Sequence, residues 1–73
     1  MASIIFLKVY ENIMNDLILF LVQDYGLEVY SVKGWFNLAL KSNNDNFFEI
    51  IKSIEDKFEI IDYKHYDLKP LTV

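Results

Sequence analysis

The chain of 73 residues contains no cysteine and no arginine, and it has only two glycines and one proline. Without thiols, it has no disulfide framework and no thiolate metal site. Two isolated glycines leave no Gly-rich phosphate loop and no nucleophile elbow. The formal net charge of −4 also argues against phosphate attraction as the basis of nucleic-acid binding, which requires a basic surface.

Long hydrophobic segments are missing as well. The longest apolar run covers residues 17–22, whereas a membrane-spanning helix needs about 20 residues. The N-terminus has four large apolar residues before Lys8, without the basic start and the longer apolar run of a signal peptide. We therefore expect a cytoplasmic protein with no membrane partner.

What the chain does have is a high content of apolar residues, 53%, of which the aromatic residues are a large part. Such a composition predicts a folded chain, and the length allows only one core. We expect a single small α+β domain over residues 1–73, with 67–73 as a tail. All basic residues are lysines, and amino acids with AT-rich codons make up almost half of the chain, which is typical of a bacterial or phage source.

Two amphipathic helices are predicted from apolar residues that recur one turn apart. For the first helix, Asn12 is the expected N-cap and Gly26 the expected stop. For the second, Asn46 and Glu49 have the spacing of a capping box. The expected apolar faces are Ile13, Met14, Leu17, Ile18, Leu21, Val22 and Tyr25 in the first helix and Phe47, Ile50, Ile51, Ile54 and Phe58 in the second.

Strands are predicted over residues 4–10, 27–33, 35–42 and 59–67, where β-branched and aromatic residues are frequent. The middle two flank Lys33-Gly34, a candidate two-residue turn. Such a turn places Val32 opposite Trp35 and Val29 opposite Leu38. One face of this hairpin then carries Leu27, Val29, Ser31, Phe36, Leu38 and Leu40, and the other Glu28, Tyr30, Val32, Trp35, Asn37, Ala39 and Lys41.

The resulting order of strand, helix, strand, strand, helix, strand resembles the ferredoxin-like split βαβ layout of ACT and RRM domains. The resemblance implies a four-stranded antiparallel sheet of order 4-1-3-2 with both helices on one face. The other face would remain open.

Partner-binding residues are expected on that open face, because large apolar patches on proteins mark interaction surfaces. The first strand contributes either Phe6, Lys8 and Tyr10 or Ile5, Leu7 and Val9. We favour the first set, which leaves the aliphatic residues for the core. The predicted partner-binding residues are Phe6, Tyr10, Tyr30, Val32, Trp35 and Asn37, with Tyr66 as a further candidate. The alternative is that these side chains pack on one another or under the tail around Pro70.

Residues for catalysis or metal binding are scarce. His65 is the only histidine, and a metal site would need further ligands at suitable spacing. The acidic residues around Glu55 and Glu59 are expected to form a solvated surface. The sequence predicts no enzyme, no cofactor and no metal.

Three functions are compatible with this pattern. The first is a regulatory or interaction module that contacts proteins through the open face, as a homodimer or as a docked subunit. The second is a small acidic inhibitor from a phage or other mobile element that blocks a basic surface of its target. The third is an RRM-like single-stranded RNA binder, since residues 33–40 are similar to the RNP1 pattern, with Lys33 and Trp35 at its first and third positions and Phe6 in an RNP2-like segment. Phe36 and Asn37 depart from that pattern, and because of the acidic balance we expect no nucleic-acid partner.

Overall fold

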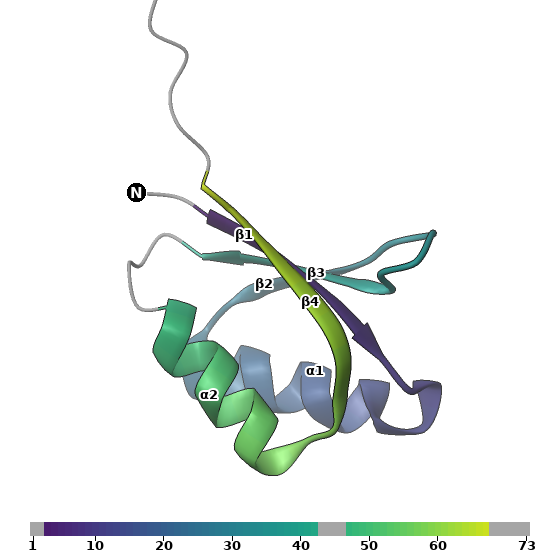
Figure 1. The fold of residues 1–73 in the computed structure, drawn as a ribbon. Helices are drawn as coiled ribbons and strands as arrows, with labels where there is room; N and C mark the ends of the chain where they lie inside the picture. Colours follow the sequence, from purple (N-terminus) through teal and green to yellow (C-terminus); the bar gives the residue numbers. More distant parts are fainter. Residues whose placement is uncertain (1–2, 43–46, 68–73) are drawn as a thin grey trace, which may run out of the picture.

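The computed structural model describes residues 3–42 and 47–67, and it confirms an α+β fold with four antiparallel strands and two helices (Figure 1). The elements, in chain order, are β1 (Ser3–Val9), α1 (Glu11–Tyr25), β2 (Glu28–Ser31), β3 (Leu38–Ser42), α2 (Phe47–Lys57) and β4 (Ile60–Asp67). Asp67 was expected both to end the last strand and to begin the tail, and it is the last residue of β4. Pro70 and the capping residue Asn46 lie outside the described residues.

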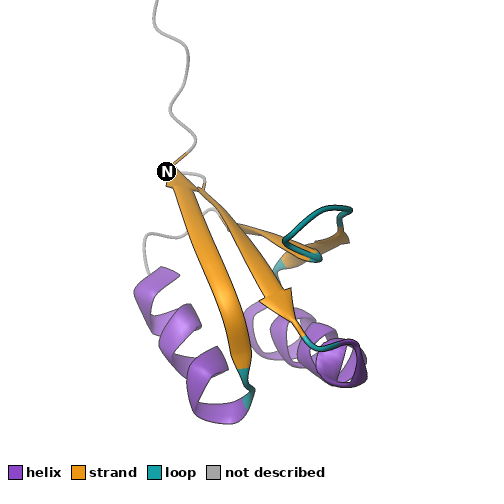
Figure 2. Cartoon of the chain, turned by 45° about the vertical axis from the view of Figure 1, so that its right-hand side comes forward, coloured by secondary structure: helices purple, strands orange, loops and turns teal. Residues whose placement is uncertain are grey.

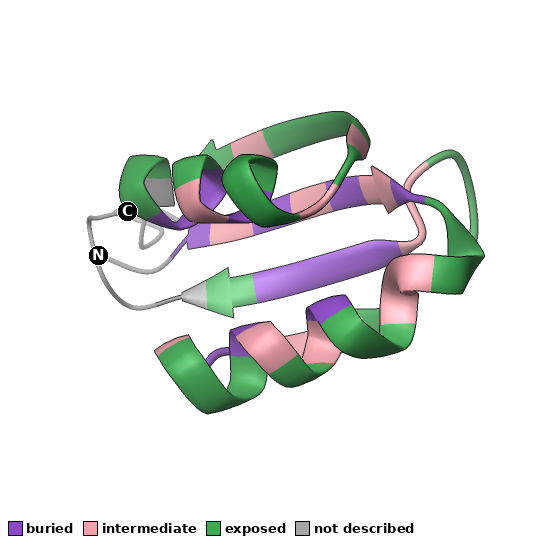
Figure 3. Cartoon of the chain, turned by 90° about the horizontal axis from the view of Figure 1, so that it is seen from below, coloured by how far each residue is buried: buried purple, intermediate pink, exposed green. Residues whose placement is uncertain are grey.

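The four strands form one antiparallel sheet of order β2-β3-β1-β4, which is the order 4-1-3-2 read from the other edge. Both helices lie against the same face of this sheet (Figure 3). Helix α2 covers the side of β1 and β4, and α1 covers the side of β3 and β2. The first and last strands are direct neighbours, so the two ends of the described chain meet at one end of the sheet.

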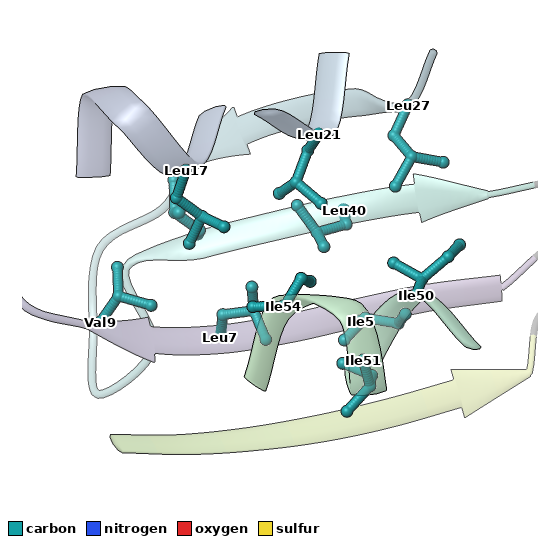
Figure 4. Close-up of a cluster of buried hydrophobic side chains, with 11 residues drawn as sticks. Ile5, Leu7, Val9, Leu17, Leu21, Leu27, Leu40, Ile50, Ile51 and Ile54 are labelled. Carbon is teal, nitrogen blue, oxygen red and sulfur yellow. The ribbon is translucent and has the colours of Figure 1, made fainter. Parts of the chain in front are cut away.

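The core lies between the sheet and the helices, and β1 shows how the sequence directs side chains into it. Ile5, Leu7 and Val9 are buried, whereas the intervening Phe6 and Lys8 are half-buried. This alternation is the period of a strand with one covered face, and it confirms the favoured register of the first strand. The other core residues are Leu38 and Leu40 of β3, Leu17 and Leu21 of α1, Ile50, Ile51 and Ile54 of α2, and Leu27 (Figure 4).

Helix α1 begins at Glu11, two residues earlier than an N-cap at Asn12 would allow. Tyr10 is the N-cap, with an extended backbone, and its carbonyl accepts a hydrogen bond from the N–H of Ile13 at 3.2 Å. The prediction of Asn12 was therefore wrong. The expected stop is confirmed, because Gly26 has φ 62° and ψ 29° and its N–H donates to the Val22 carbonyl at 3.0 Å. Only glycine adopts this left-handed conformation without steric cost.

The apolar face of α1 is rotated slightly from the one expected. Val22 was expected on it but is exposed. Phe20 was not expected there, and it packs against the core with its ring 5.6 Å from that of Tyr25 and 5.7 Å from that of Phe58. A large aromatic ring can reach the core from the margin of a helix, because it buries far more apolar area than a valine does.

The connection between β2 and β3 is longer than predicted. Ser31 pairs with Leu38 and Val29 with Leu40, so residues 32–37 replace the two-residue turn at Lys33-Gly34. The register moves by two residues, which leaves Val29, Leu38 and Leu40 facing the core as expected because strand side chains alternate with a period of two. Trp35, Phe36 and Asn37, however, lie in the connection and not in β3.

Candidate interaction face

The face of the sheet opposite the helices is called the open face here. The register places matching side chains of all four strands in rows across it, because directly paired residues share a face. One row runs from Tyr30 through Ala39 and Phe6 to Lys64. The complete open face comprises Glu28 and Tyr30 of β2, Ala39 and Lys41 of β3, Ile4, Phe6 and Lys8 of β1, and Asp62, Lys64 and Tyr66 of β4.

An aromatic cluster occupies the centre of the open face. The ring of Phe6 lies 6.0 Å from that of Phe36 and 5.8 Å from that of Tyr66, which it meets edge-on. Phe36 was expected to face the core, and this is wrong. Phe36 belongs to the connection that follows β2. Because this connection is not a strand, its side chains do not alternate between the two faces of the sheet, and Phe36 packs on Phe6 instead. Ala39, which pairs with Phe6 on one side and with Tyr30 on the other, is buried.

Two further aromatic side chains of this surface are largely exposed. Trp35 exposes 62% of its surface and Tyr30 exposes 52%. Val32, at the start of the connection, is half-buried. Tyr10 is exposed but belongs to the N-cap of α1, beyond the end of β1. The sheet therefore brings Phe6, Tyr30 and Tyr66 onto the open face. The connection between β2 and β3 adds Trp35 at one end of this face.

Trp35 is held against β4 by a hydrogen bond. Its Nε1–H donates to Oδ2 of Asp62 at 3.0 Å, and the ammonium of Lys8 lies 5.5 Å from the centre of its ring. Because Lys8 pairs with Asp62 across the sheet, the three side chains form one group at this end of the open face. Sequence reasoning missed Asp62. Strand alternation could have indicated it, because Asp62, Lys64 and Tyr66 lie two residues apart and therefore share one face of β4.

Asn37 has a bonding role inside the chain. Its Oδ1 accepts a hydrogen bond from the N–H of Val9 at 3.0 Å, and its Nδ2–H donates to the Val9 carbonyl at 2.7 Å. Its backbone N–H also donates to the carbonyl of Leu7 at 2.9 Å. Asn37, expected to contact a partner, thus joins the β2–β3 connection to the end of β1.

Tyr30 is paired with an acidic neighbour on β2. Its hydroxyl donates to Oε2 of Glu28 at 3.1 Å. This hydrogen bond, the charge of the Glu28 carboxylate and slight burial together raise the pKa of Tyr30 above its ordinary value of 10.0. The phenol is therefore held in its neutral form, as a donor, on the open face.

Charge is distributed unevenly between the two sides of the fold. The open face carries Lys8, Lys41 and Lys64 together with Glu28 and Asp62, and the ammonium of Lys64 lies 5.3 Å from the centre of the Tyr66 ring. Helix α1 carries Glu11, Asp16 and Asp24, all exposed, and no basic residue. The acidic excess of the chain is thus not a property of the open face.

Two expectations concern residues outside the aromatic cluster. His65 pairs with Ile5 and so faces the helix side of the sheet, half-buried. Within residues 3–42 and 47–67, no group of three or more His, Cys, Asp or Glu side chains could hold a metal ion. No helix in that part of the chain is long and apolar enough to cross a membrane.

The residues compared with the RNP1 pattern also have a different placement. Lys33 and Trp35 lie in the connection and not on a central strand, whereas Phe6 lies on β1 within the open face. The position on β3 that pairs with Phe6 is Ala39. Comparison of the chain with protein-family models, with curated proteins and with solved structures found no match.

Proposed function

We propose that this chain is a non-enzymatic interaction module that binds a protein partner, either a second copy or another protein, through its open face. The observation that carries the proposal is the group of aromatic side chains on the uncovered side of the sheet, with Trp35 62% and Tyr30 52% exposed. Aromatic residues dominate the binding energy of protein interfaces, because their large rigid surfaces are desolvated at little entropic cost.

The arrangement of the face supports a protein partner. Phe6, Phe36 and Tyr66 form a packed apolar centre, while lysines and carboxylates surround it, as in interfaces with an apolar core and a polar rim. Trp35 is tied to Asp62 before any partner binds, so little side-chain freedom would be lost on binding. Within this proposal the fold is a ferredoxin-like βαββαβ domain, for which the element order and the single layer of helices provide support.

The test compares two open-face variants with one control. Trp35→Ala and Tyr30→Ala remove exposed rings that are not in the core, so both proteins should fold. Leu19→Ala removes an exposed apolar side chain from α1 on the other side of the molecule and serves as the control. Sedimentation equilibrium measures self-association, and affinity capture from cells of the source measures binding to other proteins.

We expect Trp35→Ala and Tyr30→Ala each to weaken binding about tenfold or more, which corresponds to the loss of an interface residue worth over about 1.4 kcal/mol. Leu19→Ala should bind as the unchanged protein does. A monomeric chain that captures no protein, or capture that all three variants retain, would contradict the proposal. Quenching of Trp35 fluorescence by a single-stranded oligouridylate at low salt would instead assign the face to RNA.

A second function, the acidic inhibitor, is favoured by one observation. The exposed surface of α1 carries Glu11, Asp16 and Asp24 without a basic residue, so it could cover a basic surface on a target. Binding of that kind weakens steeply with salt, whereas binding through the open face should depend weakly on salt. Replacing the three acidic residues by Asn or Gln, measured at two salt concentrations, separates the two functions.

A further inference from the structure

The open face carries opposite charges at its two margins. Glu28 lies on β2 at one margin, Lys64 lies on β4 at the other, and both are exposed. The two helices lie on the opposite side of the sheet and leave both side chains uncovered (Figure 2). A surface with complementary groups at opposite margins can meet a second copy of itself about a two-fold axis.

Contacts within the face position these two groups without neutralising them. The Glu28 carboxylate accepts a hydrogen bond from the Tyr30 hydroxyl at 3.1 Å. The ammonium of Lys64 lies 5.3 Å from the centre of the Tyr66 ring. Because a neutral phenol and an aromatic ring carry no net charge, the carboxylate and the ammonium both remain able to pair with an opposite charge.

The sizes of the side chains across the face are also self-complementary. A two-fold axis along the strands, midway between β3 and β1, brings β2 of each copy over β4 of the other and β3 over β1. In the row from Tyr30 to Lys64, Ala39 of each copy then meets Phe6 of the other. The largest apolar side chain of the row thus lies over the smallest one.

The same axis brings the opposite charges together. In the neighbouring row, Glu28 of one copy meets Tyr66 of the other, and the Lys64 ammonium of that second copy lies beside this ring. Each margin of the contact therefore joins a carboxylate of one copy to an ammonium of the other. Tyr30 meets Lys64 in the first row, where an aromatic ring and a cation attract each other.

Other ways of joining two copies bring like groups together. A two-fold axis across the strands, along the row from Tyr30 to Lys64, places Lys64 over Lys64 and Phe6 over Phe6. A contact through α1 brings its acidic residues together, and this helix has no basic residue to offset them. Because like charges facing each other cost several kcal/mol, charge and size both select the axis along the strands.

We propose that two copies of this chain pack their open faces together about this axis. The inference rests on the function proposed above and names the partner as a second copy. The dimer has two sheets in its middle and the helices outside, and such sheets pack about 10 Å apart with their strands about 30° from parallel. Trp35 reaches Asp62 on β4, and Val32 follows β2, so each Trp35 also lies toward Val32 of the other copy.

The decisive experiment exchanges the charges at the margins. Glu28→Lys places lysine against Lys64 at both margins, and Lys64→Glu places glutamate against Glu28. We expect the unchanged protein to sediment at twice its mass of 8.7 kDa and each variant to dimerise about tenfold more weakly or worse. An equimolar mixture should dimerise again, because each lysine then meets a glutamate. Glu55→Lys makes the same change of charge on α2 and should dimerise as the unchanged protein does.

A second measurement tests the position of the axis. Isotope-filtered nuclear Overhauser effects between a labelled and an unlabelled copy should connect the Ala39 methyl group with the Phe6 ring. The filter is needed because these two residues also pair within one copy. A dimer without this contact would overturn the proposal, and so would a monomer in which residues 68–73 contact Phe6, since the chain would then cover its own face.

The remaining outcomes separate this inference from the proposed function. A dimer that neither charge variant weakens, or a mixture that does not recover, would overturn the face-to-face dimer. A chain that stays monomeric at millimolar concentration but captures a different protein through Trp35 would overturn the dimer and leave the proposed function standing. A monomer that captures no protein would contradict both.

Discussion

The side chain of Asn37 binds both backbone groups of Val9, a residue 28 positions earlier in the chain. Its Oδ1 accepts from the N–H at 3.0 Å and its Nδ2–H donates to the carbonyl at 2.7 Å. The pairing of β1 with β3 ends at Leu7 and Leu38. Asn37, the residue before Leu38, thus binds β1 two residues beyond the end of that pairing. It also fixes the position of the connection that carries Trp35 and Phe36 to the open face.

Replacing Asn37 by Ala should destabilise the protein by about 1–3 kcal/mol, because the partly buried N–H and C=O of Val9 lose their partners. The measurement is urea unfolding followed by circular dichroism. Asn15→Ala, which removes an exposed amide from α1, is the matched control and should change the unfolding free energy by less than about 0.5 kcal/mol. Equal effects of the two substitutions would show that the Val9 contact contributes nothing.

Two leucines of α1 test the position of the core. Leu17 is wholly buried, and Leu19, two residues later, is 55% exposed. We expect Leu17→Ala to lower the unfolding free energy by about 2–5 kcal/mol and Leu19→Ala by less than about 0.5 kcal/mol. A reversed order in thermal or urea unfolding would mean that α1 faces the sheet with a different side.

Gly26 tests the end of α1. Its φ of 62° disfavours a side chain, although an added Cβ would meet no atom within 4 Å. Gly26→Ala should therefore cost about 1 kcal/mol through backbone strain alone. Gly26→Asn should cost less, since asparagine adopts left-handed conformations more readily. If Ala and Asn gave the same unfolding free energy as Gly, the helix would end in another conformation.

Tyr30 and Glu28 give a prediction about pH. The Tyr30 pKa is raised in the folded protein, so the neutral phenol is favoured by folding. This contribution is present below the unfolded pKa of tyrosine, about 10, and is lost as the pH rises through the folded pKa. Glu28→Gln should move the pKa of Tyr30 down toward 10.0.

The titration can be followed by the ¹³Cζ resonance of Tyr30, assigned with Tyr30→Phe. Glu55→Gln removes an equivalent charge from α2 and is the control that should leave this pKa unchanged. An unaltered Tyr30 titration in Glu28→Gln would contradict the assigned cause of the shift.

Local pattern was sufficient for much of the fold. Alternation along β1 correctly separated Ile5 and Leu7 from Phe6, and the helical spacing of Ile50, Ile51 and Ile54 correctly identified their buried face. Gly26 was recognised as a stop because its conformational freedom is a property of the residue itself. Each of these features depends on residues within one or two turns, or on strict alternation.

The connection between β2 and β3 could not be predicted in the same way. Lys33-Gly34 is an acceptable two-residue turn by composition, but the bonds of Asn37 to Val9 and Leu7 move the register by two residues. Phe36 accordingly packs on Phe6 instead of entering the core. Contacts between residues so far apart leave no local signal, so the placement of Trp35 beside Asp62 was equally hidden.

The sequence by itself determined what this chain lacks and how its elements are patterned: no thiols, no arginine, no long apolar run, and two helices and four strands with one apolar side each. These follow from side-chain chemistry and periodicity, which are local. Only the tertiary structure decided which side chains share the open face and where the connection between β2 and β3 places Trp35 and Phe36. Those relationships depend on strand pairing between distant segments, where hydrogen bonds such as that of Asn37 to Val9 outweigh the local preference for a tight turn.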